Sequence, residues 1–115
     1  MSGGKGLRVV LVSVPSEAKA VELGRRLVDE RLAACVNVIP GITSIFRWEG
    51  KREDAAEALL VMKTRAERYP ALEQRILELH PYSVPEVLAL PVTSGSAAYT
   101  AWLRESVASV GGGEG

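Results

Sequence analysis

The sequence has very few residues of the types that build disulfides and preformed metal sites. Its 115 residues contain one cysteine, Cys35, and one histidine, His80. A single cysteine excludes a disulfide within the chain, which is compatible with a reducing compartment. Neither C-x-x-C, H-x-x-x-H nor a histidine-rich tract occurs, so a preformed structural zinc site is not expected.

An excess of charge of one sign is also missing. The 14 Lys and Arg residues balance the 14 Asp and Glu residues, giving a formal net charge of +0. This balance argues against nucleic-acid binding through bulk charge and against a polybasic membrane contact. No apolar run approaches the roughly 20 residues of a membrane span. The polar start MSGGKG is not followed by the apolar core of a signal peptide, and we therefore expect a cytoplasmic protein.

The local motifs that identify common enzymes are absent as well. The chain contains neither G-x-G-x-x-G nor G-x-x-x-x-G-K-[ST], the loops that cradle phosphate groups. It has no G-x-S-x-G nucleophile motif, and its only histidine is followed by proline. The sequence therefore contains no motif that indicates an enzyme.

What the chain does contain is enough apolar material for a core. Hydrophobic residues make up 47% of a length that fits one domain. We predict a single domain over residues 1–115, with flexible tails at 1–6 and 111–115.

The stretch from Ala33 to Arg52 dominates the predicted fold. It is long, apolar and rich in β-branched residues, which is typical of a strand. Pro40 and Gly41 interrupt it, and this pair indicates a bulge or bend within one long strand. A turn at Glu49 and Gly50 leads into a second arm, which starts with the charged stretch KREDAAE, expected to be solvated, and ends in the apolar run ALLVMK. The sequence thus predicts a long, bent β-hairpin.

The flanking segments predict two more strands and three helices. The apolar run Leu7–Val14 is typical of a central strand, and Ser16 is placed to cap the helix that follows. Thr64 and Glu67 have the spacing of a capping box for a second helix, which the proline after His80 ends. A last strand is expected from Val87 to Val92, where Pro91 favours a sheet edge, and a final helix follows.

The predicted order β-α-β-β-α-β, with an added C-terminal helix, is that of an α+β, ferredoxin-like split βαβ fold. Right-handed crossovers place the first strand beside the third. The hairpin strands are longer than the others, so their ends project with unpaired edges. Pairing with another subunit is one way in which a soluble protein covers such edges.

Several motifs along the chain carry a resemblance to a known family. The segments ACVNVIPGITSIFRWEGK, LLVMKT and ELHPYSVPEVLALPV follow one another in this order, and then comes the stretch from Tyr99 to Leu103. With them the chain resembles the CutA family of divalent-cation tolerance proteins, from Val9 to about Leu103. The resemblance implies a tight homotrimer whose long hairpins pair between subunits, a link to copper and other divalent metals, and an architectural likeness to PII signalling proteins. It does not supply a biochemical activity.

The candidate metal ligands are Cys35, His80 and Glu86. Thiolate and imidazole both suit copper. The stiff loop HPYSVPE, bracketed by two prolines, holds His80 and Glu86 in fixed positions. The structural alternatives are that Cys35 is a small buried hydrophobe, that His80 bonds carbonyls at a helix end, and that the prolines only guide the chain.

The candidate residues of a ligand cleft are Lys63, Tyr82 and Trp48. Lys63 ends an apolar run and can bind an anion or extend to solvent. Trp48 can stack on a ligand or pack at the hairpin tip or an interface. The resemblance places such residues in clefts between subunits. We expect a cleft at each interface that unites the three metal-ligand candidates with Lys63 and Tyr82, with Trp48 nearby.

Three functions are consistent with the sequence. The first is a cytoplasmic homotrimer that binds divalent metal, copper above all, and contributes to metal tolerance. The second is a PII-like trimer that binds a small anionic metabolite between its subunits and signals to a partner. The third is a scaffold whose main role is assembly.

Overall fold

The computed structural model describes residues 6–108, and the predicted tails lie outside this range except for Gly6. The elements are β1 (Leu7–Val14), α1 (Glu17–Asp29), β2 (Cys35–Trp48), β3 (Lys51–Arg65), the short 3₁₀ helix η1 (Ala66–Arg68), α2 (Tyr69–Leu79), β4 (Val87–Pro91) and α3 (Ala97–Ser106).

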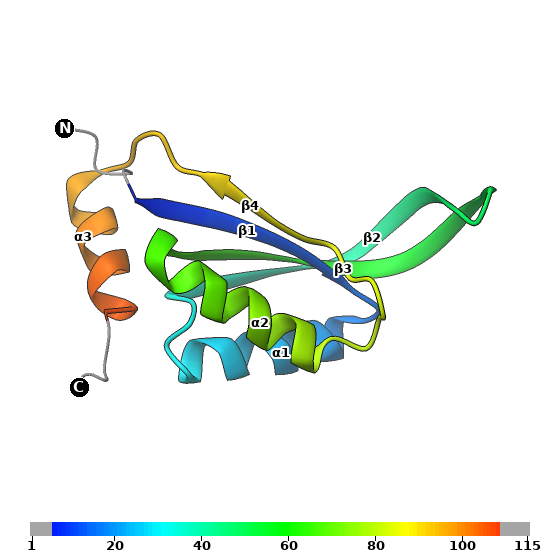
Figure 1. Ribbon diagram of the computed structural model, residues 1–115, viewed down its shortest axis with the longest axis horizontal. Coiled ribbons are helices and arrows are strands. Elements are labelled where there is room, and N and C mark those ends of the chain that lie inside the picture. The colour runs from blue at the N-terminus through cyan, green and yellow to red at the C-terminus, as the bar shows by residue number, and fades with distance from the viewer. Residues whose placement is uncertain (1–5, 109–115) are drawn as a thin grey trace.

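The four strands form one antiparallel sheet in the order β2-β3-β1-β4. The first strand lies beside the third, and the strand that ends at Pro91 lies at an edge, as predicted. Helices α1 and α2 cover one face of the sheet (Figure 1). This arrangement confirms the α+β, ferredoxin-like split βαβ fold.

The β2–β3 hairpin extends well beyond the body of the molecule, whose longest dimension is 45 Å (Figure 1). The register of the two strands shifts between Ile39 and Ile42. Gly41 has a φ of +70° there, in the left-handed region that glycine adopts without strain. The predicted bend at Pro40 and Gly41 is therefore a β-bulge.

The core lies between the helices and the covered face of the sheet. Val10, Val12 and Val14 of β1 are fully buried there. Gly24 of α1 allows close packing, because an added Cβ would lie 3.0 Å from Cγ1 of Val36. The helix residues packed into this core are Ala20, Leu23, Leu27, Leu72 and Ile76.

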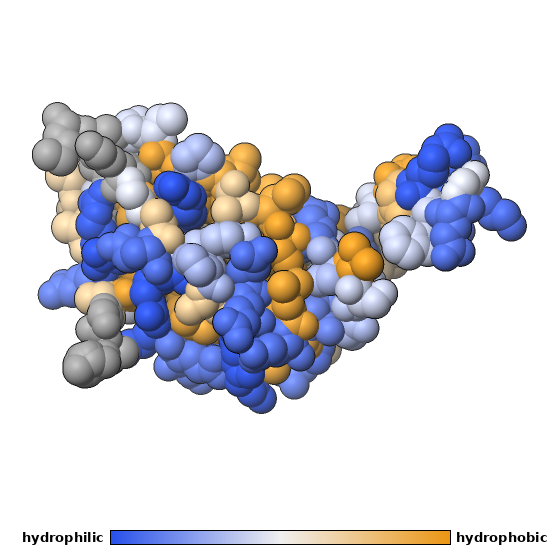
Figure 2. Space-filling model, viewed as in Figure 1, coloured by the Kyte–Doolittle hydropathy of each residue, from blue (hydrophilic) through white to orange (hydrophobic). Residues whose placement is uncertain are grey.

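The opposite face of the sheet is only partly covered. On it, Ile39, Leu88 and Leu90 are 44%, 56% and 45% exposed, and Val9 and Leu11 of β1 are only partly buried. We call this surface the open face. Figure 2 shows that hydrophobic residues interrupt the polar surface of the body in this view, and that the projecting hairpin carries hydrophobic residues among its polar ones. A single chain thus leaves a large part of its apolar sheet surface in contact with water.

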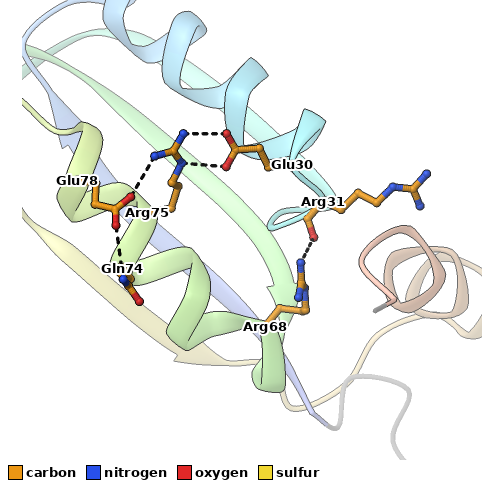
Figure 3. A network of polar contacts seen from close by, with 6 residues as sticks. All are labelled: Glu30, Arg31, Arg68, Gln74, Arg75 and Glu78. Carbon is orange, nitrogen blue, oxygen red and sulfur yellow. Dashed lines mark hydrogen bonds and ion pairs between the residues drawn. The ribbon is translucent and has the colours of Figure 1, made fainter. Parts of the chain in front are cut away.

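Polar side-chain contacts connect α2 to the carboxyl end of α1 (Figure 3). Arg75 of α2 donates two hydrogen bonds to the carboxylate of Glu30 at the end of α1, at 2.9 and 3.0 Å, and a third to Glu78 at 3.0 Å. The pKa of Glu30 is lowered, chiefly because Arg75 hydrogen-bonds to its ionised form. Next to this cluster, Arg68 donates to the carbonyl of Arg31.

The capping box predicted from Thr64 and Glu67 is wrong. Thr64 belongs to β3, is fully buried, and donates through Oγ1 to the carbonyl of Leu32 at 2.8 Å. The helical turn begins at Ala66, after Arg65, without a side-chain cap. The strand continues past Thr64 because its pairing with β1 extends to Arg65. The predicted cap at Ser16 is confirmed, since Ser16 accepts a hydrogen bond from the backbone of Lys19.

Helix α3 closes the end of the sheet near the start of β1 (Figure 1). Its Leu103, together with Val107 just beyond its end, packs against Leu7. In the part of the chain that the structure describes, no helix is long and apolar enough to cross a membrane.

Candidate functional site

The residues predicted to share one cleft form two groups in a single chain. Cys35 and Lys63 face each other across β2 and β3 at one end of the sheet. His80, Tyr82 and Glu86 lie at the other end, beyond the carboxyl end of α2. Strand β3 runs from one group to the other. Lys63 belongs to the first group, and Glu57 on the same strand contacts Tyr82 of the second. At roughly 3.3 Å per residue, Lys63 and Glu57 are about 20 Å apart along the strand. One chain therefore does not bring the predicted residues together.

The first group is arranged around the sulfur of Cys35, and we call it the thiol group. The ammonium of Lys63 lies 4.0 Å from this sulfur and also donates to the side-chain oxygen of Asn37. The sulfur lies 3.9 Å from the same oxygen. Tyr99 approaches from α3, and its pKa is raised by burial and by its interaction with Cys35. Cys35 is partly exposed, so its thiol is not simply a buried hydrophobe.

In the second group, both ring nitrogens of His80 are occupied. Nδ1 lies 3.1 Å from the backbone nitrogen of Tyr82, and Nε2 lies 2.7 Å from the carbonyl oxygen of Ser13. Because the Tyr82 N–H can only donate, Nδ1 is the acceptor and Nε2 carries the proton. His80 is 7% exposed. In this arrangement it fixes the loop after α2 to the end of β1 and has no free lone pair for a metal.

The loop after His80 presents a phenol and a carboxylate to the sheet. Tyr82 donates through its hydroxyl to Glu57 at 2.8 Å. Burial, followed by this contact with Glu57, raises the pKa of Tyr82 to about 12. Glu86 accepts a hydrogen bond from the hydroxyl of Ser13 at 3.4 Å. Within the described part of one chain it forms no ion pair with Lys63.

Tyr82, Glu57 and Glu86 line an open groove of about 870 Å³ between the loop and the projecting hairpin. Trp48 and Phe46 of β2, which lie toward the turn of the hairpin, also line this groove. Three carboxylates face it, and we call this surface the acidic groove: Glu53, Glu57 and Glu86. None of the ion pairs within residues 6–108 involves any of the three.

The two groups have complementary chemistry. The thiol group supplies a cation and a soft sulfur ligand, and the acidic groove supplies carboxylates. Carboxylates suit divalent cations in general, while thiolates select softer ions such as copper. Within residues 6–108 of one chain, however, no three His, Cys, Asp or Glu side chains gather closely enough to hold a metal ion. The donors fit a metal only if a second chain brings them together.

Sequence reasoning missed the carboxylates that the second hairpin arm contributes to the acidic groove. The charged stretch KREDAAE is predicted to be solvated, yet Glu57 is 8% exposed and receives the Tyr82 hydroxyl. The alternation of a strand does place Glu53 and Glu57 on one side. The sequence did not indicate that this side faces the loop after α2, because that depends on the register of β3 against β1. Asn37 and Tyr99 were missed because their approach to Cys35 and Lys63 depends on the pairing of β2 with β3 and on the packing of α3.

Fold and site together define a small ferredoxin-like protein with a long hairpin, an open apolar sheet face and two separate groups of candidate ligand side chains. The chain belongs to the CutA1 family: the sequence model described as "CutA1 divalent ion tolerance protein" matches residues 8–106.

Comparisons with individual proteins agree with this family assignment. The chain is 51% identical over 98 residues to the divalent-cation tolerance protein CutA of Thermus thermophilus, covering 85% of this chain and 95% of that protein. It is 48% identical over 99 residues to human Protein CutA, covering 86% of this chain but only 55% of the human protein. The solved structure of a divalent cation tolerance protein from Thermus thermophilus superimposes with a TM-score of 0.85 at 50% identity, covering 87% of this chain and 97% of that one.

Proposed function

We propose that this protein is a divalent-cation-binding protein of metal tolerance, with copper as its preferred metal. The names of its relatives support the general function. The observation that carries the proposal in this chain is the acidic groove, where Glu53, Glu57 and Glu86 face one cavity without a cationic partner in the described residues. A cation in the groove would be attracted to these carboxylates, and a second chain would have to supply further donors, because no three such side chains gather within the described part of one chain.

The preference for copper rests on Cys35. Carboxylates alone favour hard ions such as Mg²⁺ or Ca²⁺. A partly exposed thiol adds a ligand that copper binds far better than either of these. His80 contributes as a ligand only if it releases Tyr82 or Ser13, so we assign it a supporting role in the loop and keep Cys35 and Glu86 as the primary candidates.

The proposed assembly is a homotrimer. The open face exposes Ile39, Leu88 and Leu90, and a contiguous apolar surface of this kind is typical of a subunit interface. Contact through this face, with hairpins reaching across neighbours, allows the thiol group of one subunit to meet the acidic groove of the next. The positive Lys63 and the negative Glu86 then complement each other across the interface.

Copper titration of tag-free protein tests the proposal. The wild type should bind copper more tightly than Mg²⁺ or Ca²⁺, and binding should weaken on acidification because protons compete for the ligands. Cys35→Ser and Glu86→Gln should each weaken copper binding by about tenfold or more, the range seen when site residues are altered. Glu73→Gln, which removes a carboxylate from the exposed surface of α2, is the matched control. Equal copper binding in all four proteins would exclude this site.

A PII-like module for a small anionic metabolite is the second candidate, and one observation favours it. Lys63 is held beside Asn37 and Cys35, and no ion pair involves it within residues 6–108. A partly buried ammonium without a carboxylate suits an anionic ligand. Mass spectrometry of small molecules released from purified protein tests this alternative. An anion released from the wild type but not from Lys63→Gln supports it, and the absence of any such species from both counts against it.

A further inference from the structure

The contact between Lys63 and Cys35 can do more than bind a ligand. The two residues are direct partners in the β2–β3 register, so the backbone keeps them opposite each other. Directly opposed residues of an antiparallel pair have Cβ atoms about 5 Å apart. The Lys63 nitrogen lies 4.0 Å from the Cys35 sulfur. Regular structure thus holds a nucleophilic nitrogen close to an oxidisable sulfur.

The surroundings favour oxidation of this sulfur over other fates. The chain has no second cysteine, so an oxidised Cys35 has no thiol partner in the same molecule. The thiol is partly exposed and lies beside a cation, which is the environment of oxidation-prone cysteines. Tyr99 also contacts it from α3, so side chains of β3 and α3 both approach the sulfur on β2.

We propose that peroxide oxidation links Cys35 covalently to Lys63 through a reversible sulfur–nitrogen bond. In the first step the peroxide O–O bond breaks, sulfur loses two electrons, and the thiol becomes a sulfenic acid with release of one water. In the second step Lys63, having given a proton to solvent, attacks the sulfur through its lone pair. The S–N bond forms, the S–O bond breaks, and the hydroxyl leaves as a second water with one amine proton. A sulfenic acid is known to condense with a backbone nitrogen to a sulfenamide, and the Lys63 amine takes the place of that nitrogen here.

The link would remove both the thiol and the cation from the thiol group at once. Oxidation would therefore switch off the ligands proposed above for copper or for an anion. The chemistry itself requires neither ligand, so it is tested on metal-free protein and stands or falls separately from the proposed function.

The test is the intact mass of the assembled, metal-free protein after treatment with hydrogen peroxide. The wild type should become about 2 Da lighter, and dithiothreitol should restore its mass. Tryptic digestion should yield one crosslinked product that joins the peptide of Cys35 to the peptide of Lys63, with cleavage after Lys63 blocked. Lys51→Arg, at the turn end of the same strand, should crosslink like the wild type.

Lys63→Arg keeps the positive charge but lacks the amine, so it separates formation of the S–N bond from the effect of a nearby charge. It should reduce the crosslinked fraction by about tenfold or more, with its cysteine gaining about 32 or 48 Da as sulfinic or sulfonic acid. Cys35→Ser should show neither change. The proposal is overturned if the wild type only gains oxygen to the same extent as Lys63→Arg, or if its cysteines form disulfides between subunits instead.

Discussion

Replacing Leu90 by aspartate should dissociate the proposed homotrimer without unfolding the chain. Leu90 lies on the open face and is 45% exposed in a single chain, so its substitution disturbs no buried core. Burying a whole leucine side chain contributes about 1.5–3 kcal/mol, so covering the exposed part of Leu90 contributes about 1 kcal/mol per subunit. An aspartate buried there without a partner costs at least about 3 kcal/mol more. The total is about 4 kcal/mol per subunit, or about 12 kcal/mol for three.

Each 1.4 kcal/mol of lost association free energy weakens affinity about tenfold. A loss of about 12 kcal/mol should therefore dissociate a trimer at low micromolar concentration. Sedimentation of the wild type should therefore give three times the chain mass of 12.3 kDa, and Leu90→Asp should give the chain mass itself. Leu77→Asp is the matched control, because Leu77 is 51% exposed but lies on α2, away from the open face. Circular dichroism should show all three proteins folded. A trimeric Leu90→Asp, or a Leu77→Asp that dissociates equally, would refute the assignment of the interface.

Two further predictions concern single hydrogen bonds. Thr64→Val keeps the side-chain shape but leaves the buried carbonyl of Leu32 without its donor, so urea unfolding should show a loss of about 1–3 kcal/mol, and an unchanged midpoint would contradict the role of this bond. Tyr82 has a pKa raised from 10.0 to about 12 by burial and Glu57, so above pH 10 the unfolded chain ionises first. The free energy of unfolding should consequently fall more steeply between pH 10 and about 12 in the wild type than in Tyr82→Phe, and parallel curves would show that the phenol is not held by Glu57.

The order of the elements could be predicted because each segment carries its own local pattern. Ser16 caps α1, and the pair Pro40 and Gly41 forms the bulge, since both depend on residues adjacent in sequence. Thr64 misled the prediction because a threonine can cap a helix or fill a strand position. Its hydrogen bond to Leu32, a tertiary contact, decided between the two.

The candidate site was less accessible to sequence reasoning. Residue types identified Cys35, Lys63 and Glu86, but the distance between them depends on which strands pair and in what register. Glu57 was overlooked because its charged neighbours suggested a solvated arm, whereas the loop carrying Tyr82 folds over it. Contacts between subunits cannot be predicted from local sequence patterns, because they depend on how whole folded chains pack together.

The most direct test of the proposed function combines copper binding with assembly. Copper titrations of the wild type and Leu90→Asp at the same chain concentration compare a complete site between subunits with its separated halves. If the thiol group of one subunit and the acidic groove of the next bind the metal jointly, the monomeric variant should lose copper affinity by about tenfold or more while keeping its fold. Undiminished copper binding by a folded Leu90→Asp monomer would contradict a site shared between subunits.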